Sequence, residues 1–352
     1  MVQNKDKNYL FWLILLGIFC CLVYVLRSIL LPFVLGCIIG YLFDPVVDRL
    51  EKFKINRTCA VCITLASIIL IAVPSFLAIL YLAEDQIKTF IAGAPKYINA
   101  LNNKLSLIIS YLQDNIPQLN KEHIVSYMQD NVTNSFKFAG KLLQKLITGS
   151  FALFNIISLL LITPIVAFYM LRDWDSFILT VDNLLPKSHK KEIRQQAKAI
   201  DKIISSFIRG QLSVCLILGI MYAIGLSIIG LDLGLLVGFI AGIISFIPYV
   251  GSITGFFLSI CIALTQFNTI SPILAVIAVF IIGQAIEGNL LTPKLVGDSV
   301  GLHPVWVMFA LLAGGVLLGF LGLMLAVPMA AIIGVLIRFA ISKYKQSSLY
   351  QN

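Results

Sequence analysis

Long stretches without a charged residue dominate the hydropathy pattern of this chain. They cover residues 8–26, 28–43, 58–83, 146–171, 210–231, 233–286 and 299–337. A helix needs about 20 apolar residues to cross a bilayer, so most of these runs have membrane length. The longest has room for at least two crossings. The pattern predicts an all-α integral membrane protein, with some membrane segments formed by broken or hairpin helices.

The end of the last uncharged stretch is too long for one straight span. Residues 305–337 would form a helix of about 50 Å, whereas the hydrocarbon core of a bilayer is about 30 Å thick. A hairpin or a strongly broken helix is therefore favoured. The candidate hinge and pathway residues are Gly314, Gly315, Gly319, Gly322 and Pro328.

Residues 233–265 pose the same question, because the sequence FIPYVG at 246–251 interrupts an apolar run. Pro248, Gly251 and Gly255 are the candidates for a break here. Each of the two segments is either one tilted pass or a folded-back pair. A cytoplasmic C-terminus requires an even number of crossings after Arg209, so both segments are expected to adopt the same form.

Composition and charge support a membrane protein and argue against nucleic acid as a partner. Hydrophobic residues make up 59% of the 352 residues and charged residues only 12%, with a net charge of +9. The Lys and Arg residues flank the apolar runs instead of forming a basic, aromatic-rich face. By the positive-inside rule, the basic gaps at 49–57 and 172–209 and both termini are cytoplasmic.

Residues 84–145 are then extracytoplasmic. Their apolar residues recur every three or four positions, which predicts two amphipathic helices parted near Pro117. These helices could pack on each other, on the bilayer surface or on a neighbouring subunit. The expected organisation is an N-terminal three-helix membrane region (1–83), this external insert (84–145), a membrane helix (146–171), a cytoplasmic helical connector (172–209), a C-terminal membrane bundle with broken helices (210–340) and a cytoplasmic tail (341–352).

No constellation of residues typical of an enzyme appears. The three histidines, His123, His189 and His303, are far apart, and no phosphate-binding GxxxxGK[ST] or nucleophile-elbow GxSxG is present. The seven cysteines lie within or beside apolar segments, where they are interpreted as small buried hydrophobes. We therefore expect no catalytic site, no metal and no cofactor.

Glu287 is the most informative polar residue, because it follows a stretch of uncharged residues that begins after Pro272. An ionisable group at membrane depth is a candidate for a proton or sodium site, and Gln284 precedes it by three positions on the same helical face. The alternative is an interfacial carboxylate that pairs with Lys294 or caps a neighbouring helix. Asn289 is the third candidate of this group.

Other polar or helix-breaking residues are weaker candidates. Arg209 and Gln211 open a helix at the cytoplasmic edge, where an arginine can also simply reach to the interface. Further pathway or hinge candidates are Pro293, His303 and Pro304. Glycines recur every fourth residue from 230 to 242, which favours close helix packing over a cavity wall.

Five segments together resemble the autoinducer-2 exporter family of bacterial membrane proteins, also known as PerM-like permeases. They are FYMLRDWDSF (168–177), FIRGQL (207–212), FIPYVG (246–251), EGNLLTPKLVGDSVGLHP (287–304) and LAGGVLLGFLGLMLAVPMAA (312–331). The resemblance implies an oligomeric permease with about eight membrane segments in the bacterial plasma (inner) membrane. It also implies relatives that export autoinducer-2 and others that exchange sodium or lithium for protons.

The resulting hypothesis is a secondary transporter or exporter of small polar solutes or signalling molecules. The expected partners are the lipid bilayer, identical subunits, a small polar solute, and a proton or sodium ion as the coupling ion. The alternative hypothesis is a non-transporting oligomeric membrane scaffold that recruits a partner through its external helices.

Overall fold

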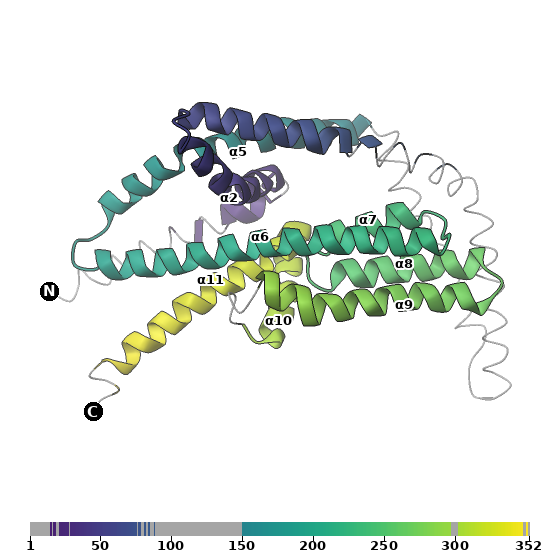
Figure 1. The fold of residues 1–352 in the computed structure, drawn as a ribbon. Coiled ribbons are helices and arrows are strands. Elements are labelled where there is room, and N and C mark those ends of the chain that lie inside the picture. Colours follow the sequence, from purple (N-terminus) through teal and green to yellow (C-terminus); the bar gives the residue numbers. More distant parts are fainter. Residues whose placement is uncertain are drawn as a thin grey trace. The chain divides into compact units, whose positions relative to one another are not determined.

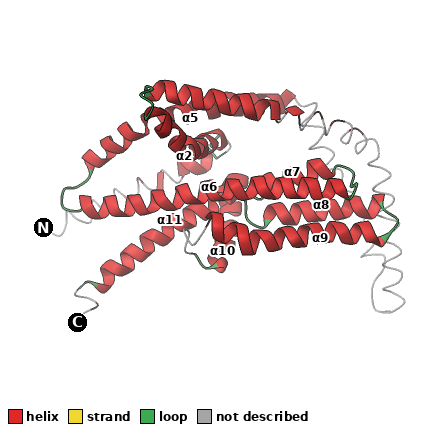
Figure 2. Ribbon diagram, in the orientation of Figure 1, coloured by secondary structure: helices red, strands yellow, loops and turns green. Residues whose placement is uncertain are grey.

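The computed structural model describes residues 29–75, 150–296 and 302–347, with scattered positions between 15 and 27 and between 77 and 88, and residue 350. Every regular element in these ranges is a helix (Figure 2). Five of the helices are long and apolar enough to cross a membrane, and three shorter ones are also apolar. The prediction of an all-α membrane protein is confirmed. The predicted external insert at 84–145 lies almost entirely outside the described residues.

In chain order, the described helices are α2 (Leu31–Glu51), a helix over Arg57–Ser75, α5 (Ser150–Leu184), α6 (Lys190–Ile228), α7 (Gly234–Ile244), α8 (Val250–Gln266), α9 (Ile270–Ile286), the π-helix η1 (Glu287–Val296), α10 (Pro304–Leu318) and α11 (Phe320–Lys345). The chain forms two compact units. Unit 1 contains α2, most of α5, the start of α6, α10 and α11; unit 2 contains the rest of α6, α7, α8, α9 and nearly all of η1.

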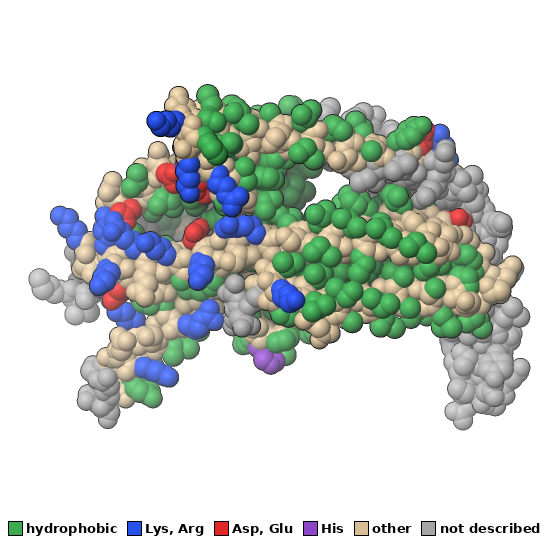
Figure 3. All heavy atoms as spheres, in the orientation of Figure 1, with side chains coloured by type: hydrophobic (Ala, Val, Ile, Leu, Met, Phe, Trp, Pro, Cys, Tyr) green, Lys and Arg blue, Asp and Glu red, His purple; other side chains and the backbone are tan. Residues whose placement is uncertain are grey.

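The predicted cytoplasmic connector, residues 172–209, is built from the polar extensions of two long helices. The 35-residue α5 continues past its apolar part to Leu184, and the 39-residue α6 begins at Lys190. Lys and Arg side chains gather where α6 begins and α11 ends, whereas hydrophobic side chains cover α7, α8 and α9 (Figure 3). A charged surface at the start of α6 and the end of α11 suits contact with water, and an apolar surface on α7, α8 and α9 suits contact with lipid.

Residues 233–265 form a folded-back pair of helices in unit 2. The chain leaves α7 after Ile244 and enters α8 through Tyr249, whose φ of 68° is left-handed. A Cβ on Gly251 would stand 2.3 Å from the backbone nitrogen of Ser245, so only glycine lets the two helices approach this closely. The third helix of this layer, α9, packs along α8 (Figure 1).

Residues 305–337 form the second hairpin, in unit 1. The chain turns at Gly319, which has a φ of 63° and a ψ of −137°. Next to the turn the two backbones touch, because a Cβ on Gly322 would stand within 1.9 Å of the Gly314 carbonyl oxygen. At the other end Leu302 contacts Gly334, so the two helices run antiparallel. Both segments are thus folded pairs, as the parity argument allows.

The hairpin does not turn at Pro328, one of the pathway or hinge candidates. Pro328 lies inside α11, which continues unbroken from Phe320 to Lys345. Membrane helices tolerate proline because neighbouring groups can satisfy the carbonyl that the proline leaves free. The break requires the positive φ of Gly319 instead.

Three of the glycines at four-residue spacing, Gly234, Gly238 and Gly242, pack α7 against α6, as the packing interpretation predicts, whereas Gly230 lies before α7 in open space. A Cβ on Gly238 would lie 2.3 Å from the Ala223 nitrogen, and one on Gly242 would lie 2.1 Å from Gly219 Cα. At these distances the helices are in backbone contact. Small residues at such interfaces are typical of helix association in lipid.

Adding one methyl group at Gly242 should therefore separate the two helices. We expect Gly242→Ala to destabilise the protein by on the order of 1–3 kcal/mol, because neither backbone can move aside cheaply. Thermal unfolding in detergent, followed by circular dichroism, measures the effect. Gly288→Ala is the matched control, since a Cβ there meets nothing within 4 Å; equal melting temperatures for the two variants would contradict the packing argument.

The turn between α5 and α6 is closed by a salt bridge that predicts a pH dependence. Arg194 donates to both carboxylate oxygens of Asp182 at 2.5 Å, and Lys190 lies 3.0 Å from one of them. These hydrogen bonds, with the two positive charges, hold the pKa of Asp182 well below its ordinary value. A lowered pKa contributes stability that is present above the unfolded pKa of about 3.9 and is lost as the pH falls below it.

The difference in melting temperature between the natural protein and Asp182→Asn should thus be constant from neutral pH to about pH 5 and shrink below about pH 4. Melting curves recorded between pH 3 and pH 7 test it. A difference that instead grows on acidification would show that the carboxylate does not act through its ionised form.

Candidate functional site

Glu287 lies in unit 2 at the point where the α-helix α9 passes into the π-helix η1. The residue is buried, with an exposed fraction of 7%, although it follows seventeen residues of apolar helix. The Gln284 side-chain amide, one turn earlier, donates to Glu287 Oε2 at 3.3 Å. The predicted neighbours Glu287 and Gln284 are therefore in contact. π-Helical turns recur at functional sites because they change the hydrogen-bonding pattern of the backbone.

Among the described residues, none of the ion pairs joins a cation to Glu287. Lys294 is exposed and forms no salt bridge with Glu287 in the described part of the chain. Burial of an ionised carboxylate without a partner costs several kcal/mol. The contacts of the described residues do not include the ion pair with Lys294 that is the alternative interpretation.

Two buried hydroxyl groups that sequence reasoning missed lie in the same unit. The hydroxyl groups of Tyr222 on α6 and Ser259 on α8 are fully buried and have no hydrogen-bond partner among the described residues. The Tyr222 ring stacks on Phe280 at 4.7 Å and lies against Gly283, one helical turn before Glu287. Buried polar groups are nearly always hydrogen-bonded, so unpaired hydroxyls here indicate a place for water, an ion or a polar solute.

A sequence signal for Tyr222 existed but was weak. Gln211, Cys215 and Tyr222 are four and seven residues apart, which places them along one face of α6. All three are buried. The residues between them are mainly apolar, so the sequence alone does not distinguish a functional polar face from an ordinary packing face of the helix.

Gln211 is a second buried polar residue of unit 2, and it satisfies the backbone at the hairpin. Its side-chain amide donates to the Ser245 carbonyl at 2.7 Å, just after the end of α7. A carbonyl freed by a helix break at membrane depth needs such a partner. Gln211 therefore supports the break that Pro248 and Gly251 make possible.

Several other predicted residues do not join Glu287. The Asn289 side chain is exposed and donates to the Ala285 carbonyl, and Pro293 is exposed within η1. Gly255 is buried against Ala241 and Phe280, which is a packing role. His303 caps the N-terminus of α10 by accepting from the Val305 nitrogen, and Pro304 is the first residue of that helix.

The glycines of the last segment belong to unit 1. Gly314 and Gly322 form the backbone contact of the hairpin, Gly319 makes the turn, and Gly315 faces the Leu323 side chain. Their arrangement explains the hairpin by packing and conformation alone.

Arg209 also belongs to unit 1, where it lines a small polar cavity. The cavity has a volume of about 170 Å³, and Tyr41, Asp44, Trp174 and Asp201 also line it. The guanidinium of Arg209 donates to the Ser205 carbonyl at 3.1 Å, within its own helix. Arg209 thus lines a cavity in unit 1 and Gln211 bonds to the α7–α8 hairpin in unit 2, although only one residue separates them.

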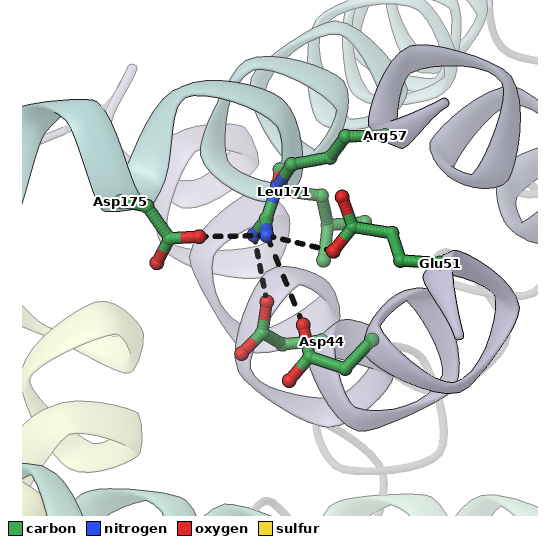
Figure 4. Close-up of polar contacts among 6 residues, drawn as sticks. Asp44, Glu51, Arg57, Leu171 and Asp175 are labelled. Carbon is green, nitrogen blue, oxygen red and sulfur yellow. Dashed lines mark hydrogen bonds and ion pairs between the residues drawn. The ribbon is translucent and has the colours of Figure 1, made fainter. Parts of the chain in front are cut away.

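The strongest polar cluster in unit 1 is centred on Arg57, which sequence reasoning treated only as a topology signal. Its guanidinium lies 2.7 Å from Asp175, 3.3 Å from Asp44 and 3.3 Å from Glu51 (Figure 4). Asp48 lies 3.8 Å away, and the Leu171 carbonyl accepts from Nε at 2.8 Å. One side chain therefore joins the end of α2, the start of the next helix and α5.

A pattern in the sequence could have predicted this cluster. Asp44, Asp48 and Glu51 are four and three residues apart, so they lie on one face of α2. Three like charges on one helical face need a cation from outside the helix. Only the fold shows that Arg57 supplies it and that Asp175 joins from α5.

Comparison with known proteins agrees with this architecture. The sequence profile of the AI-2E family transporter matches residues 12–342. The chain belongs to the AI-2E transporter family. It is 33% identical over 322 residues to the "Putative transport protein YrrI" of Bacillus subtilis, which covers 89% of this chain and 86% of that protein. It is 27% identical over 313 residues to the "Putative permease PerM" of Escherichia coli, covering 89% and 87%.

Membership of the AI-2E family confirms the family predicted from the five sequence segments. It also identifies the chain as a multi-pass membrane protein of a transporter and permease family. A family of transporters and permeases is consistent with the expectation of no catalytic site, which is based on the lack of a typical enzyme motif in the sequence.

Replacement of Arg57 should destabilise unit 1. Arg57→Gln leaves the carboxylates of α2 and α5 facing one another, and we expect a loss on the order of 1–3 kcal/mol. The stability of Arg57→Lys should lie between that of the natural protein and that of Arg57→Gln, because an ammonium group keeps the positive charge but not the planar set of hydrogen-bond donors. Melting temperatures in detergent measure the series. Arg49→Gln, an exposed position of α2, is the charge-matched control; an equal effect there would attribute the loss to net charge alone.

Proposed function

We propose that this AI-2E family member is a secondary transporter or exporter of small polar solutes in the bacterial plasma membrane, coupled to a proton or a sodium ion through Glu287. The observation that carries the proposal is the buried carboxylate at the junction of α9 and η1, which lacks a cationic partner in the described residues. Ionisable residues at membrane depth are rare and expensive, and they mark ion pathways in most cases.

The short helices of the two hairpins support a transport mechanism. At ~1.5 Å per residue, α7 is about 16 Å long and α10 about 22 Å, both shorter than the roughly 30 Å hydrocarbon core. Helices that end within the membrane present partial charges at their ends, and transporters use such ends to hold solutes and ions. In this proposal α7 and α8 supply the helix ends, and Glu287 supplies the charge that changes.

The coupling step requires two states of Glu287. A protonated or ion-bound carboxylate is compatible with the apolar surroundings, whereas the free anion favours contact with water. Gln284 stabilises the anion through its amide, and the hydroxyl groups of Tyr222 and Ser259 add oxygen atoms in the same unit. An ion gradient across the membrane can then drive the site from exposure on one side of the membrane to exposure on the other side. The driving force is assigned to an ion because the sequence carries no phosphate-binding loop.

The orientation and the assembly are parts of the same proposal. Both termini lie in the cytoplasm, in line with the basic residues Lys343 and Lys345 at the end of α11. Identical subunits assemble in the membrane, as expected from the family resemblance.

Ion movement through proteoliposomes tests the role of Glu287 directly. We expect the natural protein to change the fluorescence of a trapped pH dye when a sodium or proton gradient is imposed. Glu287→Gln cannot exchange a proton and should reduce this signal at least tenfold, whereas Glu287→Asp should retain part of it. The same vesicles are then screened for uptake of small polar solutes with and without the gradient.

Asp232→Asn is the matched control, since Asp232 is a partly exposed carboxylate in the turn before α7. An unchanged ion signal in Glu287→Gln would remove Glu287 from the coupling role. Absence of both ion and solute movement in the natural protein would favour the scaffold hypothesis.

A further inference from the structure

An apolar groove runs along one face of the α10–α11 hairpin in unit 1. Its volume is about 810 Å³. Large apolar side chains and small ones alternate along it: Trp306, Phe309 and Ala313 from α10, and Met329, Ile333 and Ile337 from α11. Trp306 and Phe309 are 62% and 61% exposed, so the groove is open at its surface. In a membrane protein such a surface contacts hydrocarbon or another apolar chain.

One end of the groove is cationic. Arg338 and His303 line this end, whereas Leu317 and Leu318 line the end at the hairpin turn. The guanidinium of Arg338 lies over Gly334, since both its terminal nitrogens are 3.9 Å from the position of a Cβ there. His303 accepts through Nδ1 from the Val305 nitrogen at 3.4 Å.

The hydropathy pattern predicts that Arg338 lies at the boundary between hydrocarbon and headgroups. It is the first charged residue after the uncharged run 299–337, and Lys343 and Lys345 follow in the last turns of α11. An arginine at this depth extends its charge to the interface while its stem covers apolar surface. Basic pockets between membrane helices at this level bind anionic lipid headgroups.

The length of the groove fits a lipid chain. The lining residues span α10 from His303 to Leu318, or about 22 Å at 1.5 Å per residue. One leaflet contributes about half of the roughly 30 Å hydrocarbon core. An acyl chain whose headgroup lies at Arg338 therefore fits inside the groove with room at the hairpin turn. A water-soluble ligand would leave the apolar lining unused.

We propose that the groove of the α10–α11 hairpin binds an anionic phospholipid, with an acyl chain along the groove and the phosphate on Arg338. The guanidinium matches a phosphate with two parallel hydrogen bonds, and the long apolar lining selects a chain. This inference concerns unit 1 and does not depend on the role proposed for Glu287.

Native mass spectrometry of the purified full-length chain tests the proposal. The protein in detergent is titrated with phosphatidylglycerol and, separately, with phosphatidylcholine of the same acyl chains. We expect tighter retention of phosphatidylglycerol. Arg338→Gln should weaken this binding about fivefold, the factor that corresponds to about 1 kcal/mol for one cation near an anionic headgroup.

Three further variants distinguish the contribution of the Arg338 charge to lipid binding from that of the apolar groove. Lys345→Gln removes the same charge outside the groove and should leave the preference unchanged. Arg338→Lys keeps a cation and should restore most of the binding. Ala313→Trp fills the groove and should weaken both lipids, while the basic end remains intact.

Three outcomes would overturn the proposal. The first is equal retention of the two lipids by the natural protein, and the second is equal losses for Arg338→Gln and Lys345→Gln. The third is an oligomer that Ala313→Trp dissociates without any loss of phosphatidylglycerol, which would assign the groove to a second copy of the chain.

Discussion

Contact between helix backbones at glycine is the interaction on which both units depend. In lipid, burial of apolar side chains gains little, because the acyl chains are as apolar as the protein, so close packing has to hold the helices together. Gly242 meets Gly219 between α7 and α6, Gly251 meets Ser245 between α8 and the end of α7, and Gly322 meets Gly314 between α11 and α10. Each contact brings two backbones together where any side chain would keep them apart. The positions of the hairpins follow from these contacts.

Close backbone packing leaves few places for polar side chains, and those present serve separate purposes. Gln211 satisfies a carbonyl at the break after α7, and Arg57 collects the carboxylates of α2 and α5 near one end of their apolar parts. Glu287 does neither, since it neither satisfies a break nor joins an ion pair among the described residues. A structural explanation accounts for Gln211 and Arg57 but leaves the cost of burying Glu287 unexplained. That difference is the reason for assigning coupling to Glu287 rather than to the more highly charged cluster.

The sequence could predict the helices and the hairpins because lengths and charges act locally. A 33-residue uncharged segment does not fit a bilayer as one straight helix, and Gly319 offers the positive φ that a turn needs. The contact of Gln284 with Glu287 also follows from helical spacing alone. By contrast, the cluster of Arg57 with Asp175 and the place of Tyr222 beside Gly283 depend on which helices are neighbours. Spacing within one helix carries no information about its neighbour, so these residues were accessible only through the fold.

The breaks themselves show which physical property decides where a membrane helix ends. Prolines lie inside α2, α5 and α11, and none of them ends its helix. The chain turns instead at positive φ, at Gly319 before α11, Leu233 before α7 and Tyr249 before α8. This conformation costs roughly 1–2 kcal/mol each at Leu233 and Tyr249, so other contacts must stabilise it. Both flank α7, whose glycines contact α6. The short helix α7 is therefore held in place by its contacts with neighbouring helices, against the backbone preference of its own connecting residues.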